Sequence, residues 1–515
     1  MSDTTGLLLS PVVITINYEN AHVCKNILIA CNEHDMLKDV KVVAYHNSTV
    51  VYEKQFQITK PRDGIQGFEI ICNKLELTIY STAIKERPAT LYYFGSPNRL
   101  IFEKSDFSDL SVLETLGSED TLPYSKVSAN ELSYTLDNID SFFTPSNKRS
   151  PMYGLMEPGS FTNMFVGVET SMDVFEMIPM GEYYITEWSA PNDSPYSDIT
   201  AHDELYDLMD EELPLLRTVN NETISSLFRR IMDALGVPVN KYKIDVSKTV
   251  RLPFGFQIGS KVRDAFDAIC EAGVCYIMCD RNGVIVMKDF EYKNPSITMT
   301  ADDYIINVNN IERFDSIINK LNITVYEPTL WRVNNSLSDF TNIVDPGTHV
   351  LDDITITDNP VVQISNVGLL NSYGCTIKHI DYGHNKLRLT IENSSSAAST
   401  INVTASVVYI KFIERTKVIQ AAPQSRTGME IKNQLIQSSE HADMIVDSII
   451  DTIKDPFSLF TLTTRGNPAI EPGDLIGIDA DIAKVFNEVI EIRSAKYTFD
   501  GGLECTYTGR RAKYD

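Results

Sequence analysis

Three cysteines stand close enough in the sequence to suggest a metal site: Cys270, Cys275 and Cys279. Thiolates that share a zinc ion at ~2.3 Å must lie within about 4 Å of one another. The segment that holds Cys275 and Cys279 has the apolar pattern of a strand, on which four residues at ~3.3 Å each separate the two thiols by ~13 Å. The spacing therefore favours packing in a core, and we expect no metal site.

An acidic run is the second candidate for chemistry, because clustered carboxylates can hold a hard cation. It consists of His202, Asp203, Glu204, Asp207, Asp210, Glu211 and Glu212. The run lacks the Asp-x-Asn/Asp-x-Asn/Asp-Gly order of a calcium loop. Its spacing instead fits the solvated face of a short helix that turns Leu205 and Leu208 inward. We therefore predict a helix surface here.

The stretch GFQIGSK, residues 255–261, resembles a phosphate-binding loop only superficially. Its spacing is not Gly-x4-Gly-Lys-Ser/Thr, and Pro253 and Phe254 precede it where a parallel strand is needed. The chain also lacks Gly-x-Ser-x-Gly, His-Glu-x-x-His and zinc-finger spacings, and its histidines stand singly, with His441 expected to be structural or on the surface. We expect no enzyme and no cofactor, although a serine or carboxylate site assembled from distant positions stays open.

Size and composition indicate an ordinary globular protein. At ~150 residues per domain, 515 residues suggest roughly three or four domains. The apolar content of 43% and charged content of 22% are typical of folded chains. A net charge of −25 argues against specific nucleic-acid binding, which depends on Lys and Arg. The acidic excess fits simple solubility, or a surface along which DNA slides without adhering.

The beginning of the chain and its cysteines bear on where the protein is made. The first residues have no basic region, and Ser10 and Pro11 interrupt their apolar run, so they make a poor signal peptide. No run approaches the ~20 apolar residues of a membrane helix. We expect a cytosolic chain that is not integral to a membrane. Its scattered cysteines predict buried free thiols: Cys24, Cys31, Cys72, Cys270, Cys275, Cys279, Cys375 and Cys505.

The first half of the chain is dense in predicted strands. Segments 40–56 and 74–84 alternate apolar and polar residues and predict a small antiparallel β-module. A second β-unit follows, in which Pro179-Met180-Gly181 is expected to turn the chain into a strand rich in aromatic residues, including Trp188.

Helical patterns and turns organise the second half. Segments 222–236 and 261–273 predict amphipathic helices, and Asn282-Gly283 predicts a two-residue hairpin turn. Residues 333–415 are strand-like and rich in Asn, Ser, Thr and Asp, which indicates an inserted β-sandwich. Segment 428–454 has apolar residues at helical spacing and predicts a long helix.

The stretch TTRGNPAIEPGDLIGID, residues 463–479, predicts two short strands around a tight bend. Gly466 and Gly473 allow sharp turns, Pro468 and Pro472 remove ladder donors, and Asp474 completes the second turn. Leu475 then restarts an apolar strand. We expect a hairpin at the rim of a barrel, because closing a barrel removes the exposed edges of a sheet.

The order of several segments resembles the barrel-forming core of tail and baseplate hub proteins of bacteriophages and related contractile injection systems. The segments are SANELSYTLDNIDSFFTPSN, GSFTNMFVGVE, IPMGEYYITEWS, DITAHDELYDLMD, SKVRDAFDAICEAGVCYIMCDRNGVIVMKDF, RGNPAIEPGDLIGID and KYTFDGGLECTYTGRR. The resemblance covers roughly residues 128–330 and 415–512. It implies a mainly β, α+β multi-domain fold with two tail-tube-like β-barrels around a small α/β domain.

The N-terminal part is similar to a galactose-binding-like jelly-roll module that is found fused to such tail proteins. The similarity rests on NILIACNEHDMLKDVKVVAYHNSTVVYEKQF, LELTIY and YYFGSPNRLIFE. Both tryptophans, Trp188 and Trp331, lie outside this module, so an aromatic platform for a sugar would have to come from Tyr or Phe. This similarity implies that the ligand of the module is a host glycan.

Together these patterns predict six regions. They are a galactose-binding-like module (1–104), a linker (105–127), a first hub β-barrel (128–218), a helix with a small α/β domain (219–330), an inserted β-sandwich-like domain (331–415), and a long helix with a second β-barrel (416–515).

The resemblance implies a structural role for the chain in the virion. A homotrimer would act as a baseplate hub or adaptor, assembled in the bacterial host cytoplasm and placed in the tail. Its partners would be the tail tube or distal tail protein, the tape-measure protein, and tip or fibre proteins. The alternative is a carbohydrate-binding adhesion protein of the tail tip, and a tail-associated hydrolase is a third hypothesis.

Overall fold

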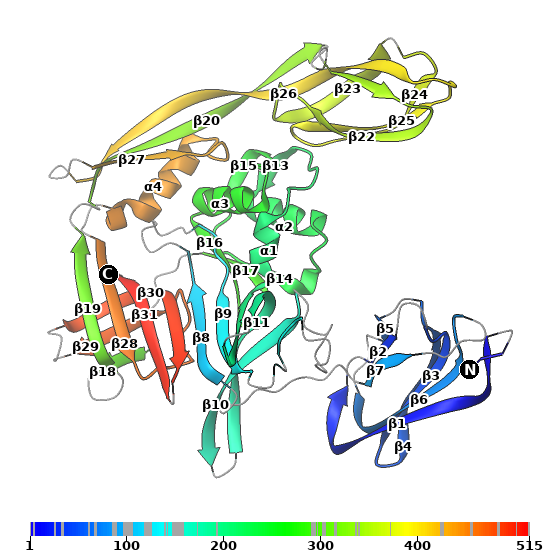
Figure 1. Ribbon diagram of the computed structural model, residues 1–515. Helices are drawn as coiled ribbons and strands as arrows, with labels where there is room; N and C mark the ends of the chain where they lie inside the picture. The colour runs from blue at the N-terminus through cyan, green and yellow to red at the C-terminus, as the bar shows by residue number, and fades with distance from the viewer. Residues whose placement is uncertain are drawn as a thin grey trace. The chain divides into compact units, whose positions relative to one another are not determined.

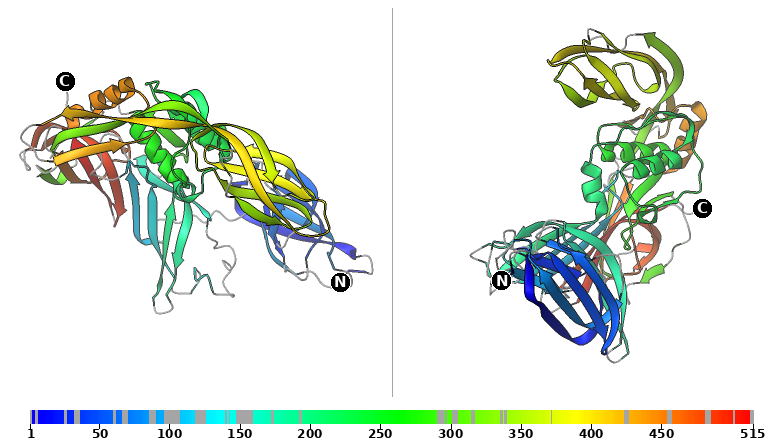
Figure 2. Two further views of the ribbon diagram at one scale, coloured as in Figure 1. Left: turned by 90° about the horizontal axis from the view of Figure 1, so that it is seen from above. Right: turned by 90° about the vertical axis from the view of Figure 1, so that its right-hand side faces the viewer.

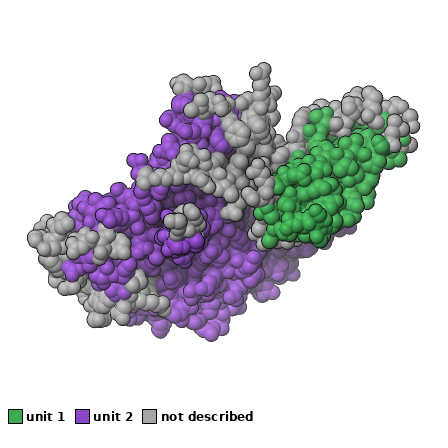
Figure 3. Space-filling view, turned by 90° about the horizontal axis from the view of Figure 1, so that it is seen from below, with its two compact units in different colours: residues 1–103 green, residues 104–515 purple. Residues whose placement is uncertain are grey.

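The computed structural model divides the chain into two compact units, Met1–Glu103 and Lys104–Asp515 (Figures 1 and 3). The structure describes residues 2–512 apart from 4–5, 25–26, 32–35, 60–61, 66–69, 85–89, 96–106, 118–125, 139–140, 142, 147–158, 172–173, 192–193, 290–294, 296, 301–304, 314–316, 335–336, 338–339, 371, 423–426, 454–456, 481–484 and 501. Among these residues strands far outnumber helices, so the predicted mainly β, multi-domain fold is confirmed.

The first unit consists of two antiparallel sheets. Its four-stranded sheet has the order β1-β6-β3-β4, and its three-stranded sheet the order β5-β2-β7. The strands are β1 (Leu7–Cys24), β2 (Ile27–Cys31), β3 (Asp39–His46), β4 (Thr49–Gln57), β5 (Arg62–Ile65), β6 (Ile70–Ser81) and β7 (Leu91–Gly95). Alternate residues of β6, such as Leu75 and Leu77, are buried in one core with Ile29 and Val42, as the period of a strand requires.

The second unit begins with a set of five antiparallel strands, in the order β10-β11-β12-β9-β8. They are β8 (Phe107–Thr115), β9 (Glu131–Asp137), β10 (Phe161–Ser171), β11 (Val174–Ser189) and β12 (Tyr196–His202). Strand β8 lies inside the segment predicted as a linker, so that prediction is wrong over its first part. Leu110 and Val112 explain why, because they alternate into the core beneath the sheet.

A second set of strands continues the same sheet. These are β18 (Ile297–Thr300), β19 (Ile305–Arg313), β28 (Phe457–Thr464), β29 (Leu475–Ala480), β30 (Val485–Phe499) and β31 (Leu503–Arg511). Antiparallel pairing of β8 with β30, from Thr115↔Ser494 to Ser111↔Thr498, joins both sets into one 11-stranded sheet. Strands β18 and β19 were predicted in the α/β domain, but they pair with β29 and β28 and belong to this sheet.

The stretch 463–479 is a loop between strands and not the predicted hairpin. Strand β28 ends at Thr464 and β29 begins at Leu475, as the turn residues indicate. The two strands do not pair, because β28 lies between β31 and β19 whereas β29 pairs with β30 and β18. Two neighbouring strands of the sheet therefore separate the ends of this loop.

Between the two sets of strands the chain forms a small α/β domain. It contains β13 (Val219–Thr223), β14 (Tyr242–Asp245), β15 (Arg251–Gly255), β16 (Cys275–Cys279), β17 (Ile285–Asp289), the single turn η2 (Val239–Lys241), and helices α1 (Glu204–Asp210), α2 (Ile224–Ala234) and α3 (Val262–Gly273). The three helices match their predicted positions. Their apolar faces pack with the sheet β14-β17-β16 around Phe228, Phe266 and Ile269.

The connection between β16 and β17 is longer than the predicted two-residue turn. Asp280 accepts a bond from the Gly283 amide at 3.0 Å, and the Asp280 amide donates to Val284 at 2.8 Å. Only Gly283 has a positive φ, +67°, so the loop is a tight turn followed by one left-handed residue. Arg281 lies in this loop, residues 280–284.

Two long strands carry the inserted β-domain. They are β20 (Ile318–Asn334) and β26 (Ser399–Gln420), paired antiparallel from Lys320↔Gln420 to Asn334↔Ser406, and we call these two strands the arm. Beyond it lie β21 (Thr341–Val344), β22 (Gly347–Thr355), β23 (Val361–Leu370), β24 (Cys375–Tyr382) and β25 (Lys386–Asn393). The sheet β22-β25-β24 packs against β21, β26 and β23 around Leu389 and Val403.

The long helix predicted over 428–454 is only half helical. Its first part is strand β27 (Thr427–Lys432), which pairs in parallel with β20, and helix α4 (Ser439–Ile453) begins seven residues later. The spacing of Ile431 and Ile445 fits both periods, because both side chains reach the same core with Leu321. The first part of the segment forms a strand because the edge of β20 is available for pairing.

Candidate functional site

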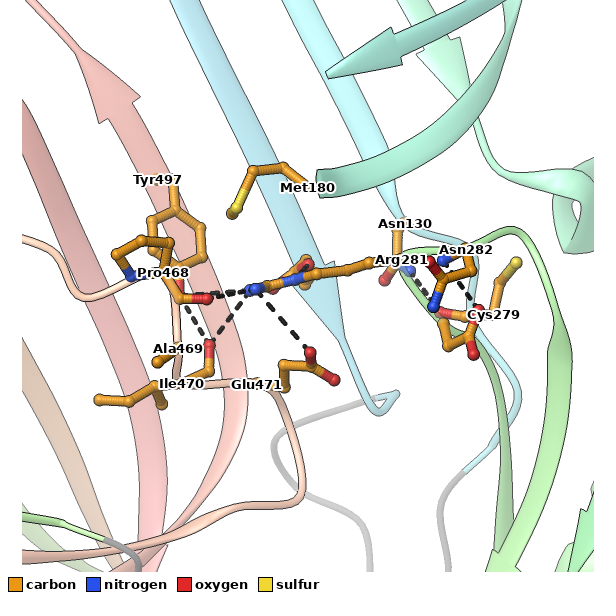
Figure 4. Close-up of polar contacts among 12 residues, drawn as sticks. Asn130, Met180, Cys279, Arg281, Asn282, Pro468, Ala469, Ile470, Glu471 and Tyr497 are labelled. Atoms are coloured by element: carbon orange, nitrogen blue, oxygen red, sulfur yellow. Dashed lines mark hydrogen bonds and ion pairs between the residues drawn. The ribbon is translucent and has the colours of Figure 1, made fainter. Parts of the chain in front are cut away.

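A junction around Arg281 joins three parts of the second unit through polar contacts. The β16–β17 hairpin carries Arg281 outward to β8 and to the loop after β28 (Figure 4). Its Nε donates to Glu114 Oε1 at 2.6 Å and its Nη2 to Glu114 Oε2 at 2.7 Å. Its Nη1 donates to the carbonyl of Pro468, and its Nη2 donates to that of Ile470 at 3.2 Å. One side chain thus bonds both strand sets to the α/β domain.

The ion pair is almost completely out of solvent. The side chains of Arg281 and Glu114 are 8% and 5% exposed. Burial would lower the pKa of Arg281, but the ion pair with Glu114 more than offsets this and raises it above its ordinary value. Burial raises the pKa of Glu114, and the contact with Arg281 opposes that shift. The two-pronged geometry requires a carboxylate, so we treat both groups as ionised.

Two tyrosines hold the loop that receives Arg281. Tyr497 Oη donates to the carbonyl of Ile470 at 2.7 Å, and Tyr507 Oη donates to that of Asn467 at 2.9 Å. Both rings lie on strands of the second set, so the loop is fixed to β30 and β31. Burial raises the pKa of Tyr497 and of Tyr507, and both hydroxyls therefore stay protonated and able to donate.

The residues predicted at the bend of 463–479 lie at this junction. Gly466 and Gly473 have φ of +81° and +94°, as the turns require. The Gly473 amide donates to Ile492 at 2.7 Å, and a Cβ there would stand 3.0 Å from Tyr276 Oη. Pro468 supplies a carbonyl to Arg281, Pro472 is buried, and Asp474 Oδ2 accepts the Glu471 amide at 2.9 Å.

Gly181 lies on β11, directly before Glu182, which is next to Gly283 of the loop 280–284. Its φ is +137°, and a Cβ there would come within 2.5 Å of the Tyr183 ring, whose hydroxyl donates to Met180 O at 2.8 Å. The next residue, Glu182, contacts Gly283 and accepts from Lys241 Nζ at 2.9 Å. The predicted turn at Pro179-Met180-Gly181 is instead a register shift within the continuous strand β11, opposite Met164 and Phe165.

Trp188 belongs to another part of β11. Its Nε1 donates to Ser197 Oγ at 2.7 Å, and its ring lies 6.5 Å from that of Phe143. These contacts hold β11 to β12, as the pairing of Trp188 with Ile199 also does. These contacts do not include the junction, so the structure does not bring Trp188 to the other predicted residues.

Sequence reasoning did not find Arg281, Glu114 or Asn130. Asn130 donates its Nδ2 to Cys279 O at 3.1 Å and accepts the Thr115 amide at 3.0 Å, so it links β16 to β8. A signal for Glu114 was present, because it follows Leu110 and Val112 at the period of the buried face. A charge in that phase of a strand needs a buried partner.

The acidic run forms the predicted helix from Glu204 to Asp210, whereas His202 ends strand β12. Leu205 and Leu208 of α1 are buried, which confirms that side of the prediction. Asp203 is not part of the solvated face, because it caps the helix from inside and accepts the amides of Leu205 and Asn130 at 3.0 and 2.8 Å. Burial raises its pKa to about 7, and these two amides oppose the shift.

The other candidates for chemistry have structural surroundings. Cys270, Cys275 and Cys279 are part of the core under α3, and all eight cysteines are buried. His441 is buried in α4 and its Nε2 contacts Ala272 O at 2.7 Å. In the stretch 255–261, Lys261 precedes α3 and bonds to Asp210 at 2.9 Å.

Two searches of the described residues bear on cofactors and membranes. They hold no cluster of three or more His, Cys, Asp and Glu side chains that could bind a metal ion. None of their helices has the length and apolar content needed to cross a bilayer.

Comparisons with solved structures find tail proteins that are similar to this chain. The structure is similar to the tail protein from Neisseria meningitidis MC58 (9% identity, TM-score 0.44, 79% of this chain and 92% of that chain). It is similar to the 43 kDa tail protein of prophage MuSo2 from Shewanella oneidensis (11%, 0.43, 82% and 95%). A third is the prophage tail protein gp18 from Listeria monocytogenes EGD-e (8%, 0.38, 91% and 94%).

These structural neighbours belong to the class of protein that the sequence segments resemble, phage tail components. No protein-family model matches the chain, and no curated protein matches it either. Identities and TM-scores at this level do not by themselves assign a function to this chain.

Proposed function

We propose that the chain is a structural component of a phage tail or of a phage-like injection apparatus. It acts as a baseplate hub or adaptor that joins the tail tube to tip proteins around a central conduit. The observation that carries this proposal is the single sheet made of two strand sets, joined at β8–β30 and locked by Arg281. Each copy contributes two joined strand sets, so a ring has twice as many strand sets as copies. This supports a ring of a few copies that matches a tail tube of higher symmetry.

Two of the three outer strands of this sheet, β10 and β19, supply edges for ring closure, and the third, β18, pairs only with β29 among the described residues. Strand β10 has β11 on one side and β19 has β28, and no other strand pairs with either among the described residues. Phe161 on β10 and Ile306 and Ile311 on β19 are exposed apolar side chains next to these edges. An edge of one kind that meets an edge of another kind makes a head-to-tail contact, which gives a ring when the rotation between copies closes and an open filament when it does not.

One face of the joined sheet suits a conduit wall. Ser111 pairs with Thr498 on one side and with Ser133 on the other, and Ser133 pairs with Thr200. Because paired residues share a face, this row presents hydroxyls across four strands. Glu131 and Asp198 stand on the same two strands in the same phase. Hydroxyls and carboxylates bind neither DNA phosphates nor apolar segments strongly, which suits passage of a polymer.

The proposed assembly is a homotrimer in the virion tail, next to the tail tube or distal tail protein, the tape-measure protein, and tip or fibre proteins. Light scattering of the full chain and negative-stain imaging test it. We expect three copies around a central hole at micromolar concentration. A chain that stays monomeric both in solution and in the presence of purified tails contradicts the proposal.

A matched pair of variants tests the edges. Ile311→Lys places a charge beside the β19 edge and should abolish assembly while the monomer keeps its circular dichroism spectrum. Val239→Lys is the control, since Val239 is 75% exposed and lies on η2 of the α/β domain, not on β19. Equal association of the two variants contradicts ring closure through β19.

A further inference from the structure

The hairpin of β10 and β11 extends beyond the sheet that it belongs to. Strand β12 pairs with β11 only from Tyr184 onward, whereas the pairing of β10 with β11 continues from Phe165↔Pro179 to Ser171↔Val174. This free ribbon, residues 164–171 and 174–181, projects by about 20 Å and is visible at one end of the sheet (Figure 1). Two-stranded ribbons without a third partner are marginally stable in water.

The surface of the ribbon is apolar and acidic. Val168, Val174 and Met177 are 47%, 53% and 56% exposed, far above the value for a core position. Between Met164 and Gly181 the sequence has Glu169, Asp173 and Glu176 and no Lys or Arg. Apolar side chains on a two-stranded projection are expected to be covered in the assembled protein.

The arm has the opposite character. Its strands carry five basic residues against Glu327 and Glu414, in a chain whose net charge is −25. Three of the five, Lys411, Arg415 and Lys417, have the same phase as Glu327, whereas Lys320 and Arg332 lie on the other face. The register pairs Glu327 with Ile413, Thr329 with Lys411, and Trp331 with Tyr409, so these residues share one face, which we call the arm face.

Large apolar groups on the arm face are open to solvent. Trp331 is 51% exposed and Ile413 is 48% exposed. The ammonium of Lys411 lies 4.5 Å from the centre of the Trp331 ring, and Arg415 contacts Glu327 at 3.0 Å. Exposed Trp beside basic side chains is the composition of an interface anchor.

We propose that the ribbon of one copy docks on the arm face of a second copy. The acidic and apolar ribbon complements the basic and apolar arm face in both charge and hydrophobicity. Within residues 104–515 the ribbon and the arm lie at opposite ends in both views (Figures 1 and 2), so a chain does not place its ribbon on its own arm face. The contact rests on the proposed assembly of several copies and adds a surface distinct from the β19 edge.

Charge exchange tests this contact directly. E169K/E176K on the ribbon and K411E/R415E on the arm should each weaken association of the full chain by about tenfold or more, measured by analytical ultracentrifugation. The two double variants mixed should associate more strongly than either alone but more weakly than the wild type, since opposite charges face each other again at only two of the three contacts of a mixed trimer. The control K243E/K248E changes the net charge as K411E/R415E does, but on the α/β domain, and it should leave association unaltered.

Tryptophan emission supplies an independent readout. Trp188→Phe leaves Trp331 as the only tryptophan, because the chain has two. Emission of Trp331 should shift to shorter wavelength as this variant associates, since docking removes water from the ring. The shift should disappear in the K411E/R415E background.

The outcomes separate this contact from the ring. If the wild-type chain stays monomeric, the proposed function fails first. If the chain associates, Ile311→Lys prevents it, and neither the charge exchange nor the emission of Trp331 responds, the docked ribbon is wrong while the ring stands.

Discussion

Arg281 and Glu114 stand 167 positions apart and form a buried, two-pronged ion pair, with N–O distances of 2.6 and 2.7 Å. Glu114 belongs to β8, the strand at which the two sets of the sheet meet, and Arg281 comes from the α/β domain. Because the same guanidinium also bonds to the carbonyl of Ile470, the pair fixes three parts of the second unit at once. The proposed role as an adaptor requires a rigid joint of this kind.

Breaking this pair should be strongly destabilising. Arg281→Met leaves the Glu114 carboxylate buried without its cation, and Glu114→Gln removes the charge from the other side. Each change should lower the free energy of unfolding of the second unit by about 3–5 kcal/mol, measured by urea denaturation. The carboxyl should also take up a proton in Arg281→Met, since burial alone raises its pKa.

The double variant R281M/E114L is the control for this prediction. It removes both charges and keeps apolar volume, so it should recover much of the lost stability. If the double variant is as unstable as the sum of the two single variants, the ion pair is not the source of the effect.

Gly473 should resist substitution for two reasons. Its φ of +94° is a conformation that L side chains rarely adopt, and an added Cβ would stand 3.0 Å from Tyr276 Oη. Gly473→Ala should therefore lower stability by about 1–3 kcal/mol, measured by thermal unfolding.

Two other glycines separate the causes. Gly159 has a φ of +78° and open space around its Cβ position, so Gly159→Ala should show only the backbone part of the loss. Gly502 also has open space and no positive φ, and Gly502→Ala should be nearly neutral. Equal effects at all three positions would contradict the contact with Tyr276.

The loop around Gly473 shows what the sequence can and cannot predict. Turn residues act locally, so the bend at Gly473 and the helices that end near Gly236 and Gly273 are visible in the sequence. Pairing partners are not local, and the pattern of residues 463–479 could not reveal that β28 and β29 lie apart. For the same reason the sequence suggested a linker where β8 joins the two sets.

The candidate site was predicted only in part. Gly466, Pro468, Pro472, Gly473 and Asp474 were identified as bend residues, and they do lie at the junction. Their partner Arg281 was not identified, because a single Arg in a turn looks like any solvated loop residue. Only the charge of Glu114, in the buried phase of its strand, pointed to a partner elsewhere.

Stability should fall in acid because of His384. Burial lowers the pKa of this imidazole from 6.5 to about 4, and its ring stacks against Phe256 at 6.2 Å. The folded state therefore binds fewer protons than the unfolded state below pH 6.5. The contribution of His384 is constant above that pH and is lost progressively down to about pH 4, by about 3 kcal/mol in total.

His384→Phe should remove this part of the pH dependence, measured as the difference between wild type and variant in urea denaturation from pH 7 to pH 4. His379→Phe is the control, because His379 lies on the same domain with an exposed side chain. Parallel stability curves for wild type and His384→Phe would show that the titration of other groups accounts for the acid sensitivity.

The hydroxyl row across Ser111, Ser133 and Thr200 can be located by thiol labelling. All eight native cysteines are buried, so a cysteine introduced by Ser133→Cys is the only readily accessible thiol. If the row faces a conduit, a small maleimide should label this position in the assembled protein while a maleimide on a bulky polymer should not. Tyr373→Cys is the control, since Tyr373 is 86% exposed on the inserted domain and should react with both reagents.

In the monomer obtained with Ile311→Lys, both reagents should reach Ser133→Cys, because the wall is then open. Equal reaction of the bulky reagent at both positions in the assembly would place the hydroxyl row on the outside, and the conduit would then have to be lined by another face.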